Sequence, residues 1–143
     1  MSQTSTFPYT FFENNIAKIQ DAKVSIMTHA LQYGTGVFGG MRGYYNKEKK
    51  YLSVFRMKDH YKRLLQSLKI LGVNFQYSQK ELEQITLDLI KKNNPQTDVY
   101  IRPFAYEGSL QVSPSLPKDT TFAFSLYMIP LGDYLPTDKG ITA

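Results

Sequence analysis

Two amphipathic helices in direct succession constrain the fold more than any other feature of this sequence. Residues 56–72 (RMKDHYKRLLQSLKILG) repeat apolar side chains at helical spacing, and Gly72 stands where a helix commonly ends. Residues 78–93 form the second helix, in which Ser78 and Glu81 have the spacing of a capping box. Each helix has one apolar stripe, so the remaining residues must supply the surface that covers both stripes.

The segments on either side of these helices are expected to be strands. Asn14 and Asn15 are expected to supply the positive φ angles of a tight hairpin turn, and NKEKK at 46–50 forms a second polar turn. A short helix is expected at 25–32. The expected strands are 10–20 (a hairpin), 37–45, 51–56, 98–108 and 121–132. Strands segregated from helices predict an α+β fold, an antiparallel sheet with the two adjacent amphipathic helices on one face.

Composition excludes several classes of protein. A chain of 143 residues is expected to form one domain, and the absence of cysteine excludes disulfides and thiolate metal sites. With two histidines, no metal site is expected. The start MSQTSTFPYTFF has no signal-peptide pattern and no apolar run could span a bilayer, so we expect a cytoplasmic protein. The net charge of +5 is spread along the chain without a nucleic-acid-binding motif, so neither a nucleic-acid nor a membrane partner is expected.

The segment YGTGVFGGMRGYY at 33–45 contains the pattern G-x-G-x-x-G, which can bind the pyrophosphate of a dinucleotide. That function requires a strand before the glycines and a helix after them. Here the expected order is the reverse, a short helix followed by a strand. We therefore interpret the glycines as positions where something approaches the strand backbone closely.

Alternation places a group of aromatic and arginine side chains on one face of the sheet. Tyr100, Arg102, Phe104 and Tyr106 share one side of their strand, and apolar residues occupy the other. Arginine is suited to bidentate binding of a carboxylate or phosphate. A purely structural stack of tyrosine on arginine remains the alternative.

Three segments together resemble a known family. The segments AKVSIMTHALQYGTGVFGGMRGY, FRMKDHYKRLLQSLKILG and YIRPFAY resemble, in order and spacing, the N-terminal small domain of branched-chain amino acid aminotransferases. These are pyridoxal-phosphate enzymes of fold type IV. The resemblance runs from about Phe12 to the end of the chain. Gly39 departs from the family, whose members commonly carry glutamate there, and the role of Arg42 stays open.

The resemblance implies roles for individual residues. Arg63, in the H-x-x-R-L helix, would contact the phosphate of pyridoxal 5′-phosphate. The remaining matched positions would line the substrate pocket, which receives amino acids and 2-oxo acids. These positions are Tyr33, Phe38, Gly40, Tyr100, Arg102 and Tyr134.

The resemblance also implies that this chain is part of a larger enzyme. Residues 1–132 would form the small domain and residues 133–143 the start of a connection to a larger domain that carries the Schiff-base lysine. No lysine here matches that position, so no catalytic residue is expected in this chain and it is expected to be inactive alone. The whole enzyme would move amino groups between leucine, isoleucine or valine and 2-oxoglutarate, as a homo-oligomer.

Other functions remain open at this stage. D-amino acid aminotransferases and aminodeoxychorismate lyases share the fold, and the motif pair Y-I-R-P and H-A-L-x-Y-G favours the branched-chain group over both. A standalone binding or regulatory module is a further alternative, as is a basic domain that binds nucleic acid.

Overall fold

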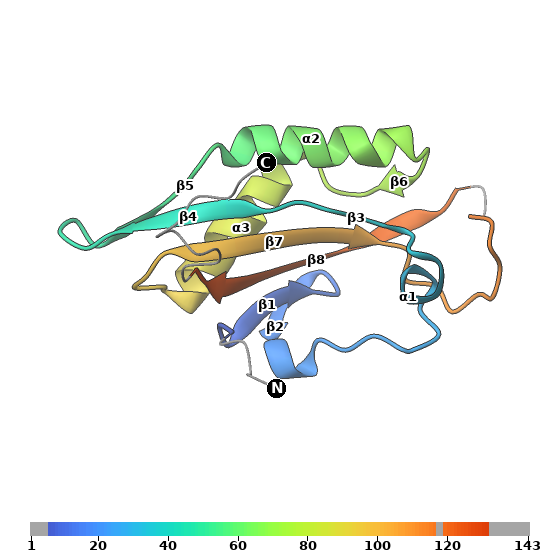
Figure 1. Cartoon of the computed structure of the whole chain (residues 1–143), viewed down its shortest axis with the longest axis horizontal. Coiled ribbons are helices and arrows are strands. Elements are labelled where there is room, and N and C mark those ends of the chain that lie inside the picture. The colour runs from blue at the N-terminus through green and yellow to red at the C-terminus, as the bar shows by residue number, and fades with distance from the viewer. Residues whose placement is uncertain (1–5, 117–118, 132–143) are drawn as a thin grey trace, which may run out of the picture.

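The computed structural model describes residues 6–116 and 119–131, which form a sheet with helices packed against it. The elements follow the order strands, short helix, strands, two long helices, strands (Figure 1). Their bounds are β1 Tyr9–Phe12, β2 Asn15–Lys18, the 3-10 helix η1 Ile19–Asp21, α1 His29–Tyr33, β3 Gly36–Phe38, β4 Met41–Asn46, β5 Tyr51–Val54, α2 Met57–Ile70, β6 Asn74–Phe75, α3 Gln79–Asn93, β7 Val99–Tyr106 and β8 Thr121–Pro130.

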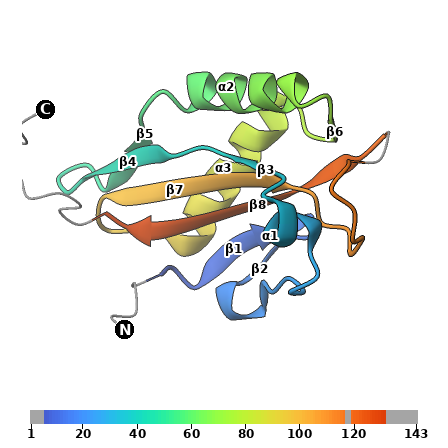
Figure 2. The same ribbon diagram turned by 45° about the vertical axis from the view of Figure 1, so that its right-hand side comes forward.

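The strands form one open sheet in the order β2-β1-β8-β7-β4-β5, with β3 also paired to β7 and β6 to β8. All of these pairs are antiparallel except β6 with β8. Both long helices lie on the same side of the sheet, whereas α1 lies on the other (Figures 1 and 2). The predicted α+β fold is therefore confirmed. The parallel pair that β6 makes was not predicted from the sequence.

The core lies between the sheet and the two long helices. Alternate side chains of β7 and β8 point toward the helices and are almost fully buried there. The buried strand residues include Val99, Ile101, Phe122, Leu126 and Met128. They pack against Leu64 and Leu68 of α2 and Leu82 and Leu89 of α3. Burial of this apolar surface is the main stabilising contribution to such a fold.

The helix ends follow the sequence signals. Ser78 caps α3 in a complete capping box, in which its hydroxyl accepts from the Glu81 backbone and the Glu81 carboxylate accepts from the Ser78 backbone. Gly72 has a φ of +68° just beyond α2, as expected for a glycine after a helix end. The first hairpin is confirmed, but its turn lies one residue earlier than predicted. Glu13 and Asn14 have the positive φ angles, and Asn15 already begins β2.

The face of the sheet opposite α2 and α3, here called the open face, is covered at one end by the chain itself. Residues 19–31 cross this end, and Tyr106, which was expected to be exposed, retains only 7% of its accessible surface. Burial raises the pKa of its hydroxyl. The prediction of a continuous exposed face is therefore wrong at Tyr106.

A fully buried histidine holds the covering segment in place. The imidazole of His29 lies 2.8 Å from the Thr35 hydroxyl through Nδ1 and 2.7 Å from the Ser113 carbonyl oxygen through Nε2. A carbonyl oxygen can only accept, so Nε2 donates to Ser113. The backbone of His29 also donates to the Ser109 carbonyl. This network joins α1 to the loop that follows β7.

No helix in the described ranges has the length and apolar character needed to cross a bilayer.

Candidate functional site

Arg102 is the central charged residue of the open face. Its guanidinium lies over the ring of Phe38, at 4.4 Å from the centroid, and near the ring of Tyr100, at 5.2 Å. Its Nε atom is buried and has no hydrogen-bond partner. A buried donor without a partner is uncommon, and on a cation it favours an anionic ligand. The two rings fix the orientation of the guanidinium while its donors remain available.

The pairing of β7 with its two neighbours assembles a pocket around this arginine. Arg102 stands opposite Tyr127 of β8, and Tyr100 stands opposite Arg42 of β4, so all four side chains are on the open face. They line a cavity of about 270 Å³ together with residues at the end of β8. Its lining consists of Arg42, Tyr100, Arg102, Tyr127, Ile129, Pro130 and Leu131. Two cations and two tyrosine rings make this pocket suitable for a carboxylate attached to a short carbon chain.

Glycines make room for the rings of β7. A Cβ atom at Gly40 would lie 2.8 Å from Cζ of Tyr100, and one at Gly36 would lie 2.5 Å from Cε2 of Phe104. Something does approach the backbone closely, as the sequence predicted. The approaching groups at these two positions are rings of this chain.

Arg63 comes from α2, on the side of the sheet opposite Arg102. It is an exposed residue of α2, and its Nη2 atom would be 3.9 Å from a Cβ at Gly39. Gly39 and Gly40 separate β3 from β4, at an edge of the sheet. Among the described residues the one ion pair joins Arg56 to Asp59, so no carboxylate neutralises Arg63. Its charge therefore remains available to an anion at this edge.

Of the two remaining pocket candidates, the structure describes only Tyr33, which lies apart from this group. Tyr33 ends α1 and is 38% exposed, with its ring packed on His29 at 4.6 Å between centroids. It does not line the cavity around Arg102. Tyr134 lies outside the described residues. The structure thus brings Phe38, Gly40, Tyr100 and Arg102 together and leaves Tyr33 at the far end of the open face.

Besides three residues at the end of β8, two residues of the cavity with polar side chains, Arg42 and Tyr127, were not among the predicted site residues. Arg42 shares the face of Phe38 and Gly40 by simple alternation, so the pattern already indicated its direction. Tyr127 follows the same alternation in β8, but the surrounding residues are mostly apolar, so the sequence did not single it out as a site residue. Only the register between β7 and β8 shows that Tyr127 stands opposite Arg102.

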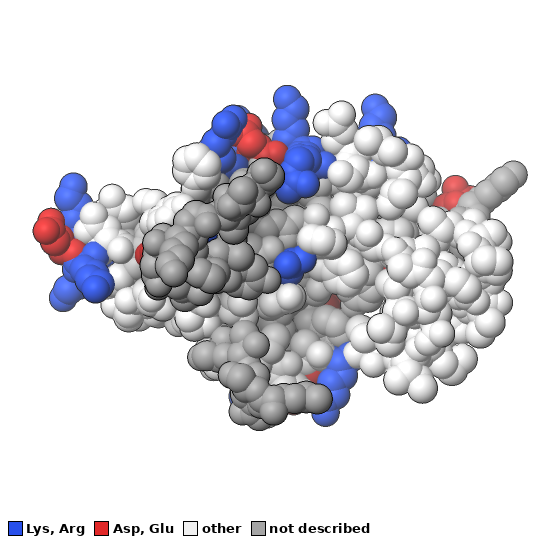
Figure 3. Space-filling model, in the orientation of Figure 1, with Lys and Arg blue, Asp and Glu red and all other residues white. Residues whose placement is uncertain are grey.

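The site has the chemistry of anion binding. Within residues 6–116 and 119–131, no three histidine, aspartate or glutamate side chains are close enough to share a metal ion. Lysine and arginine side chains are prominent over α2 and at the β4–β5 hairpin (Figure 3). Arg63 and Arg102 both lack an ion-pair partner among the described residues, and each carries a guanidinium that can bind an anion.

Comparisons with known proteins point to one family. The family model described as amino-transferase class IV matches residues 36–142. A probable branched-chain-amino-acid aminotransferase of Aquifex aeolicus is 40% identical over 143 residues, which are 100% of this chain and 46% of the relative. The chain therefore spans about half the length of the curated relatives it matches.

Solved structures give the same result. The branched-chain aminotransferase of Thermoproteus uzoniensis with norvaline superposes with a TM-score of 0.83 at 35% identity, covering 90% of this chain and 42% of that one. The branched-chain amino acid aminotransferase of Thermobaculum terrenum, in its PLP-bound holo-form, gives 0.80 at 29% identity, covering 90% and 42%.

We predict that His60, one helical turn before Arg63, makes stability depend on pH. Burial, and secondarily the charge of Arg63, lower the pKa of its imidazole below the ordinary value of 6.5. The unfolded state then binds a proton more readily than the folded state, so the free energy of unfolding falls as pH decreases through the ordinary histidine range. Replacing His60 by Gln should reduce this loss, measured as the difference between urea midpoints at about pH 7.5 and pH 5.5.

Lys62→Gln provides the control, because it removes a neighbouring charge that does not titrate in this range. It should keep the wild-type difference between the two midpoints. An equal difference in the His60 variant and the wild type would show that His60 does not contribute.

Proposed function

Because the chain belongs to the class IV aminotransferase family, we propose that it forms part of a branched-chain aminotransferase. The enzyme would transfer the amino group of leucine, isoleucine or valine to 2-oxoglutarate with pyridoxal 5′-phosphate. The residues described here would bind and orient the reactants, and a lysine outside this chain would bind the cofactor covalently. The observation that carries the proposal is the guanidinium of Arg102, held between two rings with a buried donor unpaired.

Arg63 is proposed to hold the cofactor phosphate. It is exposed, lacks an ion-pair partner among the described residues and lies at the sheet edge beside Gly39. A guanidinium binds phosphate through two parallel hydrogen bonds, which fixes the orientation of the bound group as well as its position. When bound, pyridoxal phosphate supplies the electron sink for the chemistry at the amino-acid Cα.

One pocket must accept both an alkyl side chain and the carboxylate of glutamate. Arg102 would pair the carboxylate, and Phe38 and Tyr100 would contact an alkyl chain with their rings. With an alkyl substrate the cation remains partly hydrated, since Arg102 is only half-buried. It therefore avoids the full cost of an unpaired buried charge. This pairing explains how a single site can bind two substrates of different polarity.

Arg102→Ala tests this division of roles in the full-length enzyme. Loss of a charged hydrogen-bonded contact should reduce kcat/KM for glutamate and 2-oxoglutarate by about thirtyfold, equivalent to roughly 2 kcal/mol. Leucine makes no ionic contact there, so its rate should fall much less. Half-reaction rates measured separately for the two amino acids give the comparison. Equal losses would mean that Arg102 supports the fold or binds a group common to both substrates.

Arg63→Met tests the phosphate contact. A charge-assisted hydrogen bond contributes roughly 1.5 to 3 kcal/mol, so the variant should bind the cofactor one to two decades more weakly. Cofactor release during dialysis, followed by absorbance, measures this directly. Lys69→Met, an exposed cation near the far end of α2, is the matched control and should release cofactor at the wild-type rate. Equal release from both variants would mean that Arg63 is a surface residue without this role.

We also propose that the protein self-associates through the end of the molecule formed by α1 and the loop after β7. Six apolar side chains there are 48% to 81% exposed, namely Val24, Ile26, Met27, Leu31, Leu110 and Val112. The corresponding side of Figure 3 is nearly free of charged side chains. Such an apolar patch is typical of an interface. Ile26→Asp combined with Val112→Asp should lower the molar mass measured by light scattering.

Ile70→Asp is the control for this measurement. Ile70 is 79% exposed, the same fraction as Ile26, but it lies at the end of α2. This variant should retain the wild-type molar mass. A wild-type protein that is already monomeric would contradict the proposal.

A further inference from the structure

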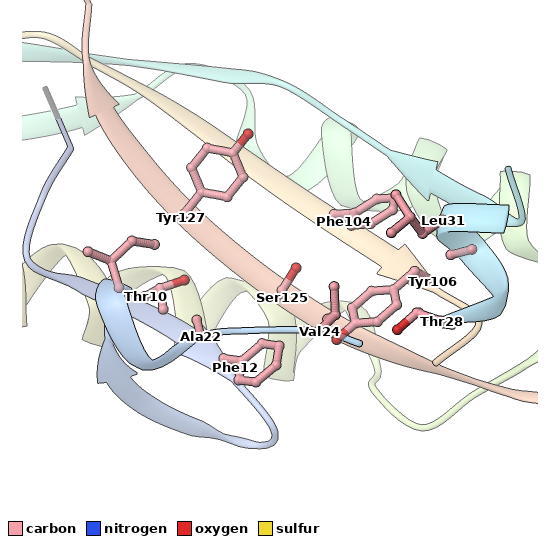
Figure 4. Close-up of a pocket in the computed structure, with 12 residues that line it drawn as sticks. Thr10, Phe12, Ala22, Val24, Thr28, Leu31, Phe104, Tyr106, Ser125 and Tyr127 are labelled. Carbon is pink, nitrogen blue, oxygen red and sulfur yellow. The ribbon is translucent and has the colours of Figure 1, made fainter. Parts of the chain in front are cut away.

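A second cavity lies on the open face, next to the pocket around Arg102. It has a volume of about 310 Å³ and is bounded by the sheet on one side and by residues 19–31 on the other. Figure 4 shows Ser125 near its centre, Phe104, Tyr106 and Leu31 toward one end, and Tyr127 toward the other. We refer to this space as the α1 cavity. Its size is within the range of small-molecule sites.

The α1 cavity is mainly apolar and uncharged. None of its twelve lining residues is charged, and most contribute hydrocarbon or aromatic surface. Phe104 and Tyr106 stack on one another at 5.2 Å with nearly parallel rings. The hydroxyl of Thr10 is already used, because it donates to the Leu126 carbonyl at 2.8 Å. The cavity can therefore accept neutral hydrocarbon or aryl groups, and it offers no cationic side chain to pair with a carboxylate.

Among the described residues, Tyr127 is the one that lines both spaces. It projects from the open face of β8, directly opposite Arg102 in β7, and is half-buried. Its side chain therefore stands between a pocket that contains two arginines and a cavity that contains none. Truncation of this side chain would join the two spaces without changing a residue of the core, which lies on the other face of the sheet.

We propose that Tyr127 determines substrate specificity as the wall that limits the length of the side chain the enzyme accepts. This inference rests on the proposed function. A short branched side chain fits beside Arg102, Phe38 and Tyr100 without passing Tyr127. A longer apolar group would have to extend past this ring, and the space behind it has the chemistry that an aryl or long alkyl group requires. Tyr127 thus excludes such substrates from a cavity that could otherwise bind them.

Tyr127→Ala in the full-length enzyme tests the proposal. Removal of the ring should increase kcat/KM for phenylalanine relative to leucine by about tenfold or more, the scale expected when a site gains apolar volume. Tyr127→Phe keeps the ring and should still exclude phenylalanine. Adding Ser125→Leu to Tyr127→Ala places a larger side chain near the centre of the joined space. This double variant should lose the increase in kcat/KM for phenylalanine relative to leucine.

Tyr44→Ala is the matched control. Tyr44 is a 45% exposed tyrosine of β4, and it lines neither of the two cavities, so its truncation should leave the ratio at the wild-type value. Tyr127→Val also removes the ring, and valine favours strands. If the alanine variant does not fold, the ratio of kcat/KM for phenylalanine and leucine is measured in the valine variant instead. The proposal is overturned if the ratio stays within about twofold of wild type in the opened variant while leucine is still transaminated.

Indole binding gives a readout that needs neither cofactor nor activity. The protein without pyridoxal phosphate is heated at increasing indole concentrations, and the rise in Tm reports binding to the folded state. Tyr127→Ala should show a larger rise than the wild type, and the variant that also carries Ser125→Leu should lose it. An equal rise in Tm in all three proteins would refute the proposal that the Tyr127 ring separates the two spaces. A wild-type enzyme that fails to use leucine would instead refute the proposed function, so the two failures are distinguishable.

Discussion

Eight consecutive residue pairs join β7 to β8, from Val99 opposite Pro130 to Tyr106 opposite Ala123. This register directs one set of side chains into the core and the other set onto the open face, because strand residues alternate in direction. A shift of one residue in β7 would bring Arg102 into the apolar layer and expose Ile101, and the same shift in β8 would expose Leu126. Burial of the apolar layer under α2 and α3 therefore determines the register of β7 and β8, and this register determines which side chains form the candidate site.

The site also depends on where side chains are missing. Gly40 allows the Tyr100 ring to lean over β4, and this ring in turn contacts the Arg102 guanidinium. Gly39 leaves the sheet edge near Arg63 without a side chain that could fill the space. Two adjacent glycines thus separate β3 from β4 at an edge of the sheet, where Gly39 lies near Arg63 of the helix layer and Gly40 near Tyr100 of the open face. Glycine serves here to make space, since neither residue has a positive φ angle.

Much of this arrangement could be predicted from local patterns. Ser78 and Glu81 indicated the start of α3 because both capping bonds form within one helical turn. The alternation in residues 99–106 indicated which side chains share a face with Arg102. The first hairpin was placed one residue late, because two consecutive asparagines suggested the turn while Glu13 and Asn14 adopt it. Tyr106 was assigned to an exposed face because alternation gives the direction of a side chain and does not say what covers it.

By itself the sequence determined the two long helices, the α+β class and the face on which Arg102 lies, since each of these follows from local patterns. It did not show β6, or the break at Gly39 and Gly40 that divides the strand expected at 37–45 into β3 and β4. Only the tertiary structure decided the rest. It placed Tyr127 opposite Arg102, at a separation of 25 positions along the chain, and bound the Ser113 carbonyl to His29 across 84 positions. It also covered Tyr106 with residues 19–31 and left Tyr33 apart from Arg102. The physical reason is that such pairs form only when the whole sheet packs against α2 and α3, and no local pattern records which distant side chains then meet.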